Sequence, residues 1–155
     1  MRSNDLALMP HQKIHQEKLK ISPFHGLGIF DDVGTGKTIS ALNIVNNHFK
    51  VRNSPVLLLV PPTLFEKWGT EVRIWCGMNV NPVTPNKNGM KLSSGINILS
   101  HGKCHGDVPN KIPKIGLLIV DEAHHFRNEE TQSSKFVLEL CNNADERLLM
   151  TATPI

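Results

Sequence analysis

The chain has 155 residues, of which 39% are hydrophobic and 20% are charged. This length and balance suit one domain with a buried core, and they exclude a disordered or fibrous protein. The net charge of +3 is too small to indicate nucleic-acid binding by itself.

Three features of the sequence indicate the cellular compartment of the protein. No run of about 18 apolar residues occurs, so we expect no membrane span. Residues 1–10 lack the apolar core of a signal peptide. The three cysteines are scattered and odd in number, which favours reduced thiols over a disulfide framework. The sequence therefore predicts a protein that is cytoplasmic, or nuclear if eukaryotic, and not secreted.

Short apolar runs alternate with helix-like stretches along the chain. The runs are rich in Ile, Leu and Val without polar alternation, as expected for strands covered on both faces, and they lie at 27–30, 56–60, 96–99, 117–120 and 148–150. The helix-like stretches lie at 37–49, 63–75 and 131–141. This alternation predicts an α/β fold, a mostly parallel sheet with helices on both faces, in a single domain over 1–155.

Two polar stretches are predicted to be loops. Residues 79–95 are rich in Pro, Asn, Gly and Ser, with a weak strand at the start, and 101–113 form the second loop. Between 85 and 114 there are five lysines and one acidic residue. On charge alone, a solvated loop face explains this basic segment better than a binding site does.

The segment 31–38, Asp-Asp-Val-Gly-Thr-Gly-Lys-Thr, lies between a predicted strand and a predicted helix. Glycines in this position let backbone N–H groups surround phosphates, and the helix N-terminus adds positive potential. The strict phosphate-loop pattern has Gly where this chain has Asp31. We expect a nucleotide-binding loop formed by Val33, Gly34, Thr35, Gly36, Lys37 and Thr38. Lys37 would reach the β- and γ-phosphates, and the Thr38 hydroxyl would ligate Mg²⁺.

An apolar strand ends in two carboxylates at Asp121 and Glu122. An acid at the tip of a strand beside a phosphate loop holds Mg²⁺ directly or through water, and Asp121 fits that role. Glu122 can orient or polarise the attacking water. Together with Lys37, these residues are the predicted catalytic set, with ATP and Mg²⁺ as cofactors. The nearby residues His101, Cys104, His105, His124 and His125 do not have the spacing of a zinc site.

These motifs resemble superfamily-two helicases and translocases, most closely the Swi/Snf-type ATPases. Residues 31–38 look like the family's Asp-Asp-Met-Gly-Leu-Gly-Lys-Thr, and 121–128 look like its Asp-Glu-Ala-His-x-x-x-Asn block. Further matches are 8–12, 57–72 and 148–155. Thr35 replaces the usual Leu, and Thr151-Ala152-Thr153 is closer to the helicase form than to the Swi/Snf form, which leaves open whether the parent motor unwinds strands or translocates on duplex.

The resemblance implies a RecA-like phosphate-loop lobe that pairs with a second lobe, with ATP in the cleft between the two and nucleic acid across both. It implies that Gln12 reads the adenine and that His124, Thr151 and Thr153 couple the ATP site to the nucleic-acid site. Nucleic-acid contacts are expected from Pro62, Thr63, Leu64, Ser100, His101 and Lys103. DNA is expected more than RNA, and we expect no membrane partner.

Three functional hypotheses remain. The first is one lobe of an ATP-dependent nucleic-acid motor whose second lobe lies on another chain or has been lost. The expected arginine finger would come from that lobe, so this chain alone should show little or no turnover. The second is a catalytically silent nucleotide-binding module that recruits partners. The third, an unrelated phosphate-loop ATPase that remodels proteins, is disfavoured by the blocks at 61–68 and 151–153.

Overall fold

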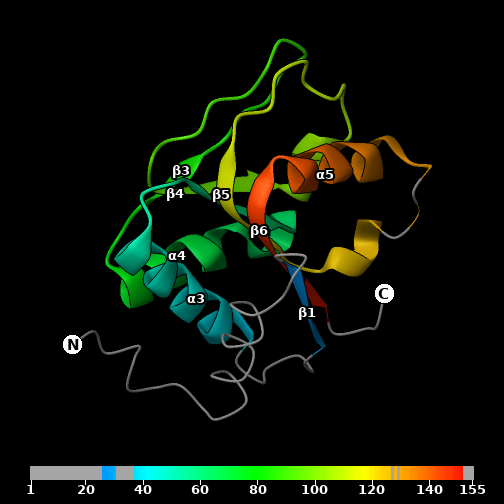
Figure 1. The fold of residues 1–155 in the computed structure, drawn as a ribbon. Coiled ribbons are helices and arrows are strands. Elements are labelled where there is room, and N and C mark those ends of the chain that lie inside the picture. The colour runs from blue at the N-terminus through cyan, green and yellow to red at the C-terminus, as the bar shows by residue number, and fades with distance from the viewer. Residues whose placement is uncertain (1–25, 31–36, 127, 129, 152–155) are drawn as a thin grey trace.

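The computed structural model describes residues 26–30, 37–126, 128 and 130–151 (Figure 1). These residues form one six-stranded sheet flanked by helices. The strands are β1 (Gly26–Phe30), β2 (Val56–Val60), β3 (Val80–Pro82), β4 (Ile96–Ser100), β5 (Ile115–Val120) and β6 (Ala144–Thr151). The α-helices are α3 (Lys37–Val51), α4 (Phe65–Cys76) and α5 (Gln132–Asn142), and the 3₁₀ turns are η1 (Pro62–Leu64), η2 (His101–Cys104) and η3 (Ala123–Phe126).

All paired strands run parallel, in the order β1-β6-β5-β2-β4-β3. The central strands β2 and β5 are buried along their whole length, which explains their continuous apolar sequence. The predicted parallel α/β fold and the weak strand at the start of the 79–95 loop are confirmed.

Two apolar layers hold the fold together, one on each face of the sheet. On one face, Leu42 and Val45 of α3 and Trp68 and Val72 of α4 pack against alternate strand residues such as Leu58. On the other face, α5 contributes Phe136, Val137 and Leu140. Figure 1 shows α3 and α4 on one side of the sheet and α5 on the other. Both faces therefore bury apolar surface, the main favourable term in folding.

Strand β6 begins at Ala144, four residues before the predicted start at 148. Three of the four missed residues, Asp145, Glu146 and Arg147, are charged, and a burial pattern cannot identify them as strand. Each finds a partner at the sheet edge: Asp145 pairs with Lys114 at 2.9 Å, Glu146 pairs with Arg52 at 3.4 Å, and Arg147 donates to the Cys141 carbonyl at 3.0 Å. Polar partners, rather than apolar burial, extend this strand.

Parallel strands place all their carboxyl ends at one edge of the sheet. Here that edge carries η1 after β2, η2 after β4 and Asp121 after β5. Predicted site residues that follow different strands are thus brought to the same edge of the sheet. Among the described residues, no helix has the length and apolar character needed to cross a membrane.

Candidate functional site

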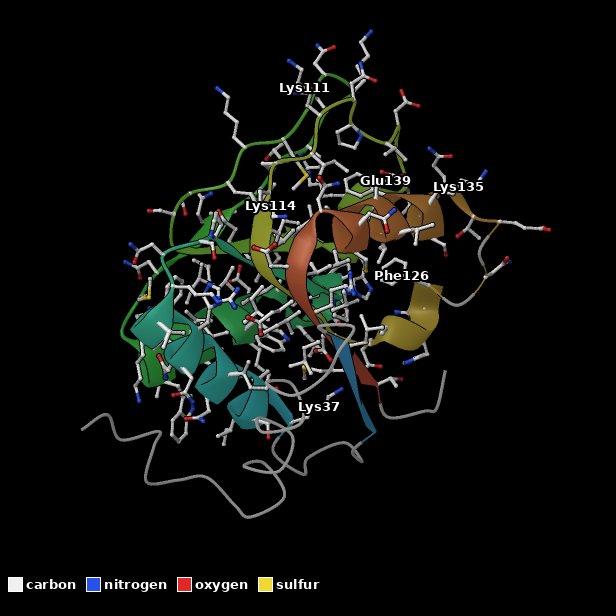
Figure 2. All side chains as sticks on the ribbon, viewed as in Figure 1. Lys37, Lys111, Lys114, Phe126, Lys135 and Glu139 are labelled. Carbon is white, nitrogen blue, oxygen red and sulfur yellow. The ribbon has the colours of Figure 1, made fainter. Side chains whose placement is uncertain are left out.

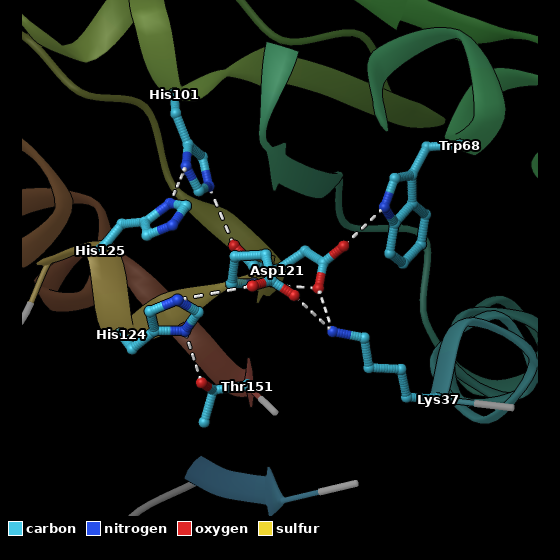
Figure 3. A network of polar contacts seen from close by, with 8 residues as sticks. Lys37, Trp68, His101, Asp121, His124, His125 and Thr151 are labelled. Carbon is cyan, nitrogen blue, oxygen red and sulfur yellow. Dashed lines mark hydrogen bonds and ion pairs between the residues drawn. The ribbon is translucent and has the colours of Figure 1, made fainter. Parts of the chain in front are cut away.

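Lys37 and the two carboxylates lie together at the carboxyl edge of the sheet (Figure 3). The Lys37 Nζ is 3.0 Å from Asp121 Oδ1 and 2.8 Å from Glu122 Oε1. Residues 85 positions apart therefore meet as one ionic cluster. Burial disfavours the Lys37 ammonium, but the hydrogen bond to Glu122 and the charge of Asp121 outweigh it and raise the pKa of Lys37.

Glu122 has two features typical of a functional residue. Its φ is +52°, a left-handed conformation that side chains with a Cβ rarely adopt outside functional or constrained sites. Burial opposes its ionised form, but the hydrogen bond from Lys37 holds the pKa of Glu122 below its usual value. Glu122 is therefore a carboxylate at neutral pH, as a residue that orients water requires.

Asp121 is almost fully buried, and both its carboxylate oxygens are occupied. Oδ1 accepts from the Glu122 backbone N–H at 2.9 Å and contacts Lys37, while Oδ2 accepts from Trp68 Nε1 at 2.9 Å. A Mg²⁺ ion held through water fits this arrangement better than direct ligation, because no oxygen of Asp121 lacks a donor. Trp68 is 1% exposed. It lies in the 57–72 block that resembles the family, but its contact with Asp121, 53 residues away, leaves no local signal in the sequence.

His124 and Thr151 are also brought together. The His124 Nδ1 is 2.7 Å from Thr151 Oγ1, and its Nε2 is 3.5 Å from Glu122 Oε2 (Figure 3). This chain of contacts joins the end of β6 to the acidic end of β5. Of the residues predicted to couple two sites, His124 thus contacts both Thr151 and Glu122. Thr153 lies outside the described residues.

His101 points inward. Its Nε2 donates to the Asp121 carbonyl at 2.9 Å, and its Nδ1 lies 3.3 Å from His125 Nδ1. Burial and the neighbouring His125 lower the pKa of His101 to about 4, so the ring is neutral near pH 7. The sequence predicted a nucleic-acid contact here, but this side chain is directed at the acidic strand end instead.

The other predicted nucleic-acid residues lie on the adjacent turns η1 and η2. Pro62, Thr63 and Lys103 are exposed, and Leu64 and Ser100 are half-buried. The turns are neighbours because Val60 at the end of β2 pairs with Ser100 at the end of β4. Ser100 Oγ accepts from the Gly102 N–H at 3.2 Å, which shapes η2. This surface lies at the same sheet edge as Asp121.

A cavity of about 400 Å³ opens beside the ionic cluster. Its lining includes Lys37, Thr38, Trp68, Asp121 and Glu122, so Thr38 borders the same space as the carboxylates. The predicted nucleotide residues Gln12, Val33, Gly34, Thr35 and Gly36 lie outside the described residues. The structure therefore places Lys37, Thr38, Asp121 and Glu122 together.

Comparison with known proteins gives one family model, the SNF2-related domain, which matches residues 18–155. The chain is 27% identical over 180 residues to the DNA repair and recombination protein RAD54-like of Danio rerio, covering 96% of this chain and 24% of that protein. It is 28% identical over 137 residues to the human DNA annealing helicase and endonuclease ZRANB3, covering 81% of this chain and 12% of that protein.

Among solved structures, the fold is similar to the Sulfolobus solfataricus SWI2/SNF2 ATPase core in complex with dsDNA. The TM-score is 0.80 at 23% identity, over 95% of this chain and 32% of that chain. A second structure, the Sulfolobus solfataricus SWI2/SNF2 ATPase core domain, matches with a TM-score of 0.75 at 22% identity. The chain thus spans about a quarter or less of the curated relatives described above and about a third of the solved core.

Proposed function

Because the chain belongs to the SNF2-related domain family, we propose that it is the ATP-binding lobe of a DNA-dependent ATPase. The observation that carries this proposal is the position of the Lys37 ammonium between Asp121 and Glu122, beside a cavity at the carboxyl edge of a parallel sheet. Ligands of open α/β sheets bind at this edge. The family favours this function over the silent module and over a protein-remodelling ATPase.

Lys37, Thr38 and Asp121 are the residues proposed to hold ATP and Mg²⁺. Bound Mg²⁺ would supply positive charge that neutralises the negative charge developing on the transferred phosphoryl group. Thr38 lines the cavity, and Asp121 is positioned to accept from Mg²⁺-bound water. Lys37 contacts the carboxylates, so its transfer to the phosphates of ATP would release Glu122 to orient the attacking water.

DNA contact is proposed for the exposed edge of η1 and η2. Thr63, Lys103 and backbone N–H groups can bind phosphates, and such contacts carry no base sequence information. One relative is described as a DNA repair and recombination protein and another as a DNA annealing helicase and endonuclease, and one solved neighbour is a complex with dsDNA. Duplex DNA is therefore the proposed partner, in a cellular compartment that holds DNA.

A second RecA-like lobe is the other proposed partner, since the matched relatives and the solved core are several times longer than this chain. That lobe would close the ATP site and supply an arginine finger, worth about 10³–10⁵ in rate in such enzymes. Alone, this chain should bind ATP weakly and turn it over little.

The first test is nucleotide binding and hydrolysis by the 155-residue chain, with and without duplex DNA, beside Lys37→Ala. We expect Mg²⁺-dependent ATP binding that Lys37→Ala abolishes, with little hydrolysis in any condition. Equal ATP affinity in both proteins would contradict the proposed site. DNA-stimulated turnover that depends on Lys37 would show instead that a complete site forms, for example between two copies.

A further inference from the structure

Three side chains at the end of β5 place metal-binding atoms close together. One ligand atom each from Glu122, His124 and His125 lies within 4.8 Å of the other two. Glu122 and His124 are partly exposed and His125 is exposed, so a dissolved ion can reach them. Their spacing, Glu-x-His-His, is not that of a closed structural zinc site. It provides three ligands and leaves a fourth position open to water.

The distance between two of these ligands matches a tetrahedral metal. His124 Nε2 and Glu122 Oε2 are 3.5 Å apart. Two ligands bound to Zn²⁺ at about 2.0–2.2 Å in tetrahedral geometry lie roughly 3.4 Å from each other. The other ring nitrogen of His124 is 2.7 Å from Thr151 Oγ1. Such an outer hydrogen bond orients the ring and is typical of metal-binding histidines.

The hydrogen bonds of His101 determine which nitrogen of His125 is available. The Asp121 carbonyl can only accept, so His101 Nε2, 2.9 Å away, carries the proton. The Nδ1 of the neutral His101 ring then accepts, and His125 Nδ1 donates to it at 3.3 Å. A neutral His125 is left with its lone pair on Nε2. His125 thus has its own outer-shell partner, as His124 does.

Charge also favours a cation here. Lys37, Asp121 and Glu122 together carry a net charge of −1. Lys37 contacts Oε1 of Glu122, whereas Oε2 faces His124, so a metal on Oε2 leaves the Lys37 contact in place. Two imidazoles and one carboxylate select Zn²⁺ or a similar transition metal over Mg²⁺, which prefers oxygen ligands.

We propose that Glu122, His124 and His125 form a binding site for a divalent transition-metal ion, with Zn²⁺ as the best-fitting ion. This site is separate from the Mg²⁺ position proposed for Thr38 and Asp121. Its consequence, which rests on the proposed function, is inhibition: a metal on Glu122 removes the carboxylate that would orient the attacking water.

The test is a Zn²⁺ titration of the nucleotide-free chain against a chromophoric chelator, with Co²⁺ absorption as a second readout. We expect Zn²⁺ to bind and Co²⁺ to give the intense visible bands of tetrahedral nitrogen and oxygen ligation, without thiolate charge-transfer bands. His125→Gln should weaken Zn²⁺ binding at least ~10-fold, because losing a ligand costs no less than losing an outer-shell partner. Glu122→Gln should weaken it as well, so the site is tested twice.

His105→Gln is the matched control. His105 is an exposed histidine of the same lobe, 2.7 Å from Ser133 Oγ and outside the cluster. It should leave Zn²⁺ affinity unchanged, and circular dichroism of each variant checks folding. Affinity that is unchanged in both His125→Gln and Glu122→Gln, or lowered as much by His105→Gln, would overturn the proposal. Nucleotide binding with Lys37→Ala is measured separately, so failure of the metal site and failure of the proposed function are distinguishable.

Discussion

At the residue scale, the acidic end of β5 depends on donors that reach it from other elements. Asp121 is 1% exposed, and a buried carboxylate is tolerated only when donors satisfy it. Trp68 Nε1 donates to Oδ2. The Glu122 backbone N–H donates to Oδ1, and the Lys37 ammonium forms an ion pair with the same oxygen. These contacts fix the carboxylate in one orientation, which positions any Mg²⁺-bound water.

Trp68→Phe tests this role, because it keeps an aromatic ring in the core while removing the N–H donor together with part of the buried ring. We expect a loss of about 1–3 kcal/mol in the free energy of unfolding, the usual cost of leaving a buried acceptor unpaired, measured by urea denaturation. Trp75→Phe is the control. Its Nε1 donates to Glu71 Oε2 one helical turn away between partly exposed side chains, so loss of this hydrogen bond should cost under ~1 kcal/mol. Equal losses in the two variants would show that the hydrogen bond to Asp121 contributes no more to the free energy of unfolding than the bond to Glu71 does.

His101 gives the molecule a pH-dependent stability. Its pKa is lowered from 6.5 to about 4 in the folded chain, so the unfolded state binds this proton first as pH falls. The contribution of neutral His101 is fully present above pH 6.5 and is lost as pH falls to about 4. We expect the urea midpoint of the wild type to drop over this window. His101→Gln, which can still donate to the Asp121 carbonyl, should show a shallower drop, and an equally steep one would contradict the assignment.

At the element scale, the sheet requires a glycine in β5. A Cβ on Gly116 would overlap the Ser54 side chain and lie 2.9 Å from His48 Cε1. His48 in turn holds the turn before β2, since its Nε2 is 2.8 Å from the Ser54 carbonyl oxygen. The backbones of α3, this turn and β5 therefore approach each other more closely than a side chain at Gly116 allows.

Gly116→Ala should lower the free energy of unfolding by about 1–3 kcal/mol, the typical cost of overpacking. Gly106→Ala is the matched control, because a Cβ there meets nothing within 4 Å. Thermal unfolding of both variants gives the comparison. In a Gly116→Ala/Ser54→Gly double variant, removal of the Ser54 side chain should restore part of the loss, as expected for residues in contact. A strictly additive double variant would contradict the steric explanation.

The sequence predicted elements well where burial determines them, and poorly where polar contacts do. The apolar runs of β2 and β5 predicted buried strands correctly. The start of β6 was missed because ion pairs support it. Asn97 is fully buried in β4 and was not singled out, although its side chain bonds the Val56 carbonyl, the Ser93 backbone and Asn81. These partners are either far away in the sequence or lie in the preceding turn. The periodicity of apolar residues therefore does not predict them.

The same distinction holds for the site. Lys37, Asp121 and Glu122 were predictable because a short motif and a strand tip each indicate phosphate chemistry, and parallel topology brings them to one edge. The contacts of Trp68 and His101 with Asp121 were not predictable, since each joins residues 53 or 20 positions apart through side-chain geometry. Local patterns therefore identified the reacting groups but not the residues that position them.

At the scale of the whole molecule, lysines of one basic stretch of sequence lie at different ends of the sheet. Lys103 is on η2 at the carboxyl edge, whereas Lys111 precedes β5 at the amino edge. Figure 2 shows Lys111 at the far end of the molecule from Lys37. The side chains of Lys103 and Lys111 are both exposed. If DNA crosses the edge that carries η1 and η2, Lys103 is placed to meet it and Lys111 is not.

Lys103→Ala should therefore weaken binding of duplex DNA, and Lys111→Ala should not. Each lysine that neutralises a phosphate releases a counterion, so the slope of log affinity against log salt should become shallower by about 1 in Lys103→Ala alone. Binding measured by fluorescence anisotropy at several salt concentrations gives both quantities. A wild-type affinity independent of salt would exclude phosphate contact at this surface. Equal losses in the two variants would show that the whole basic stretch attracts DNA without a defined edge.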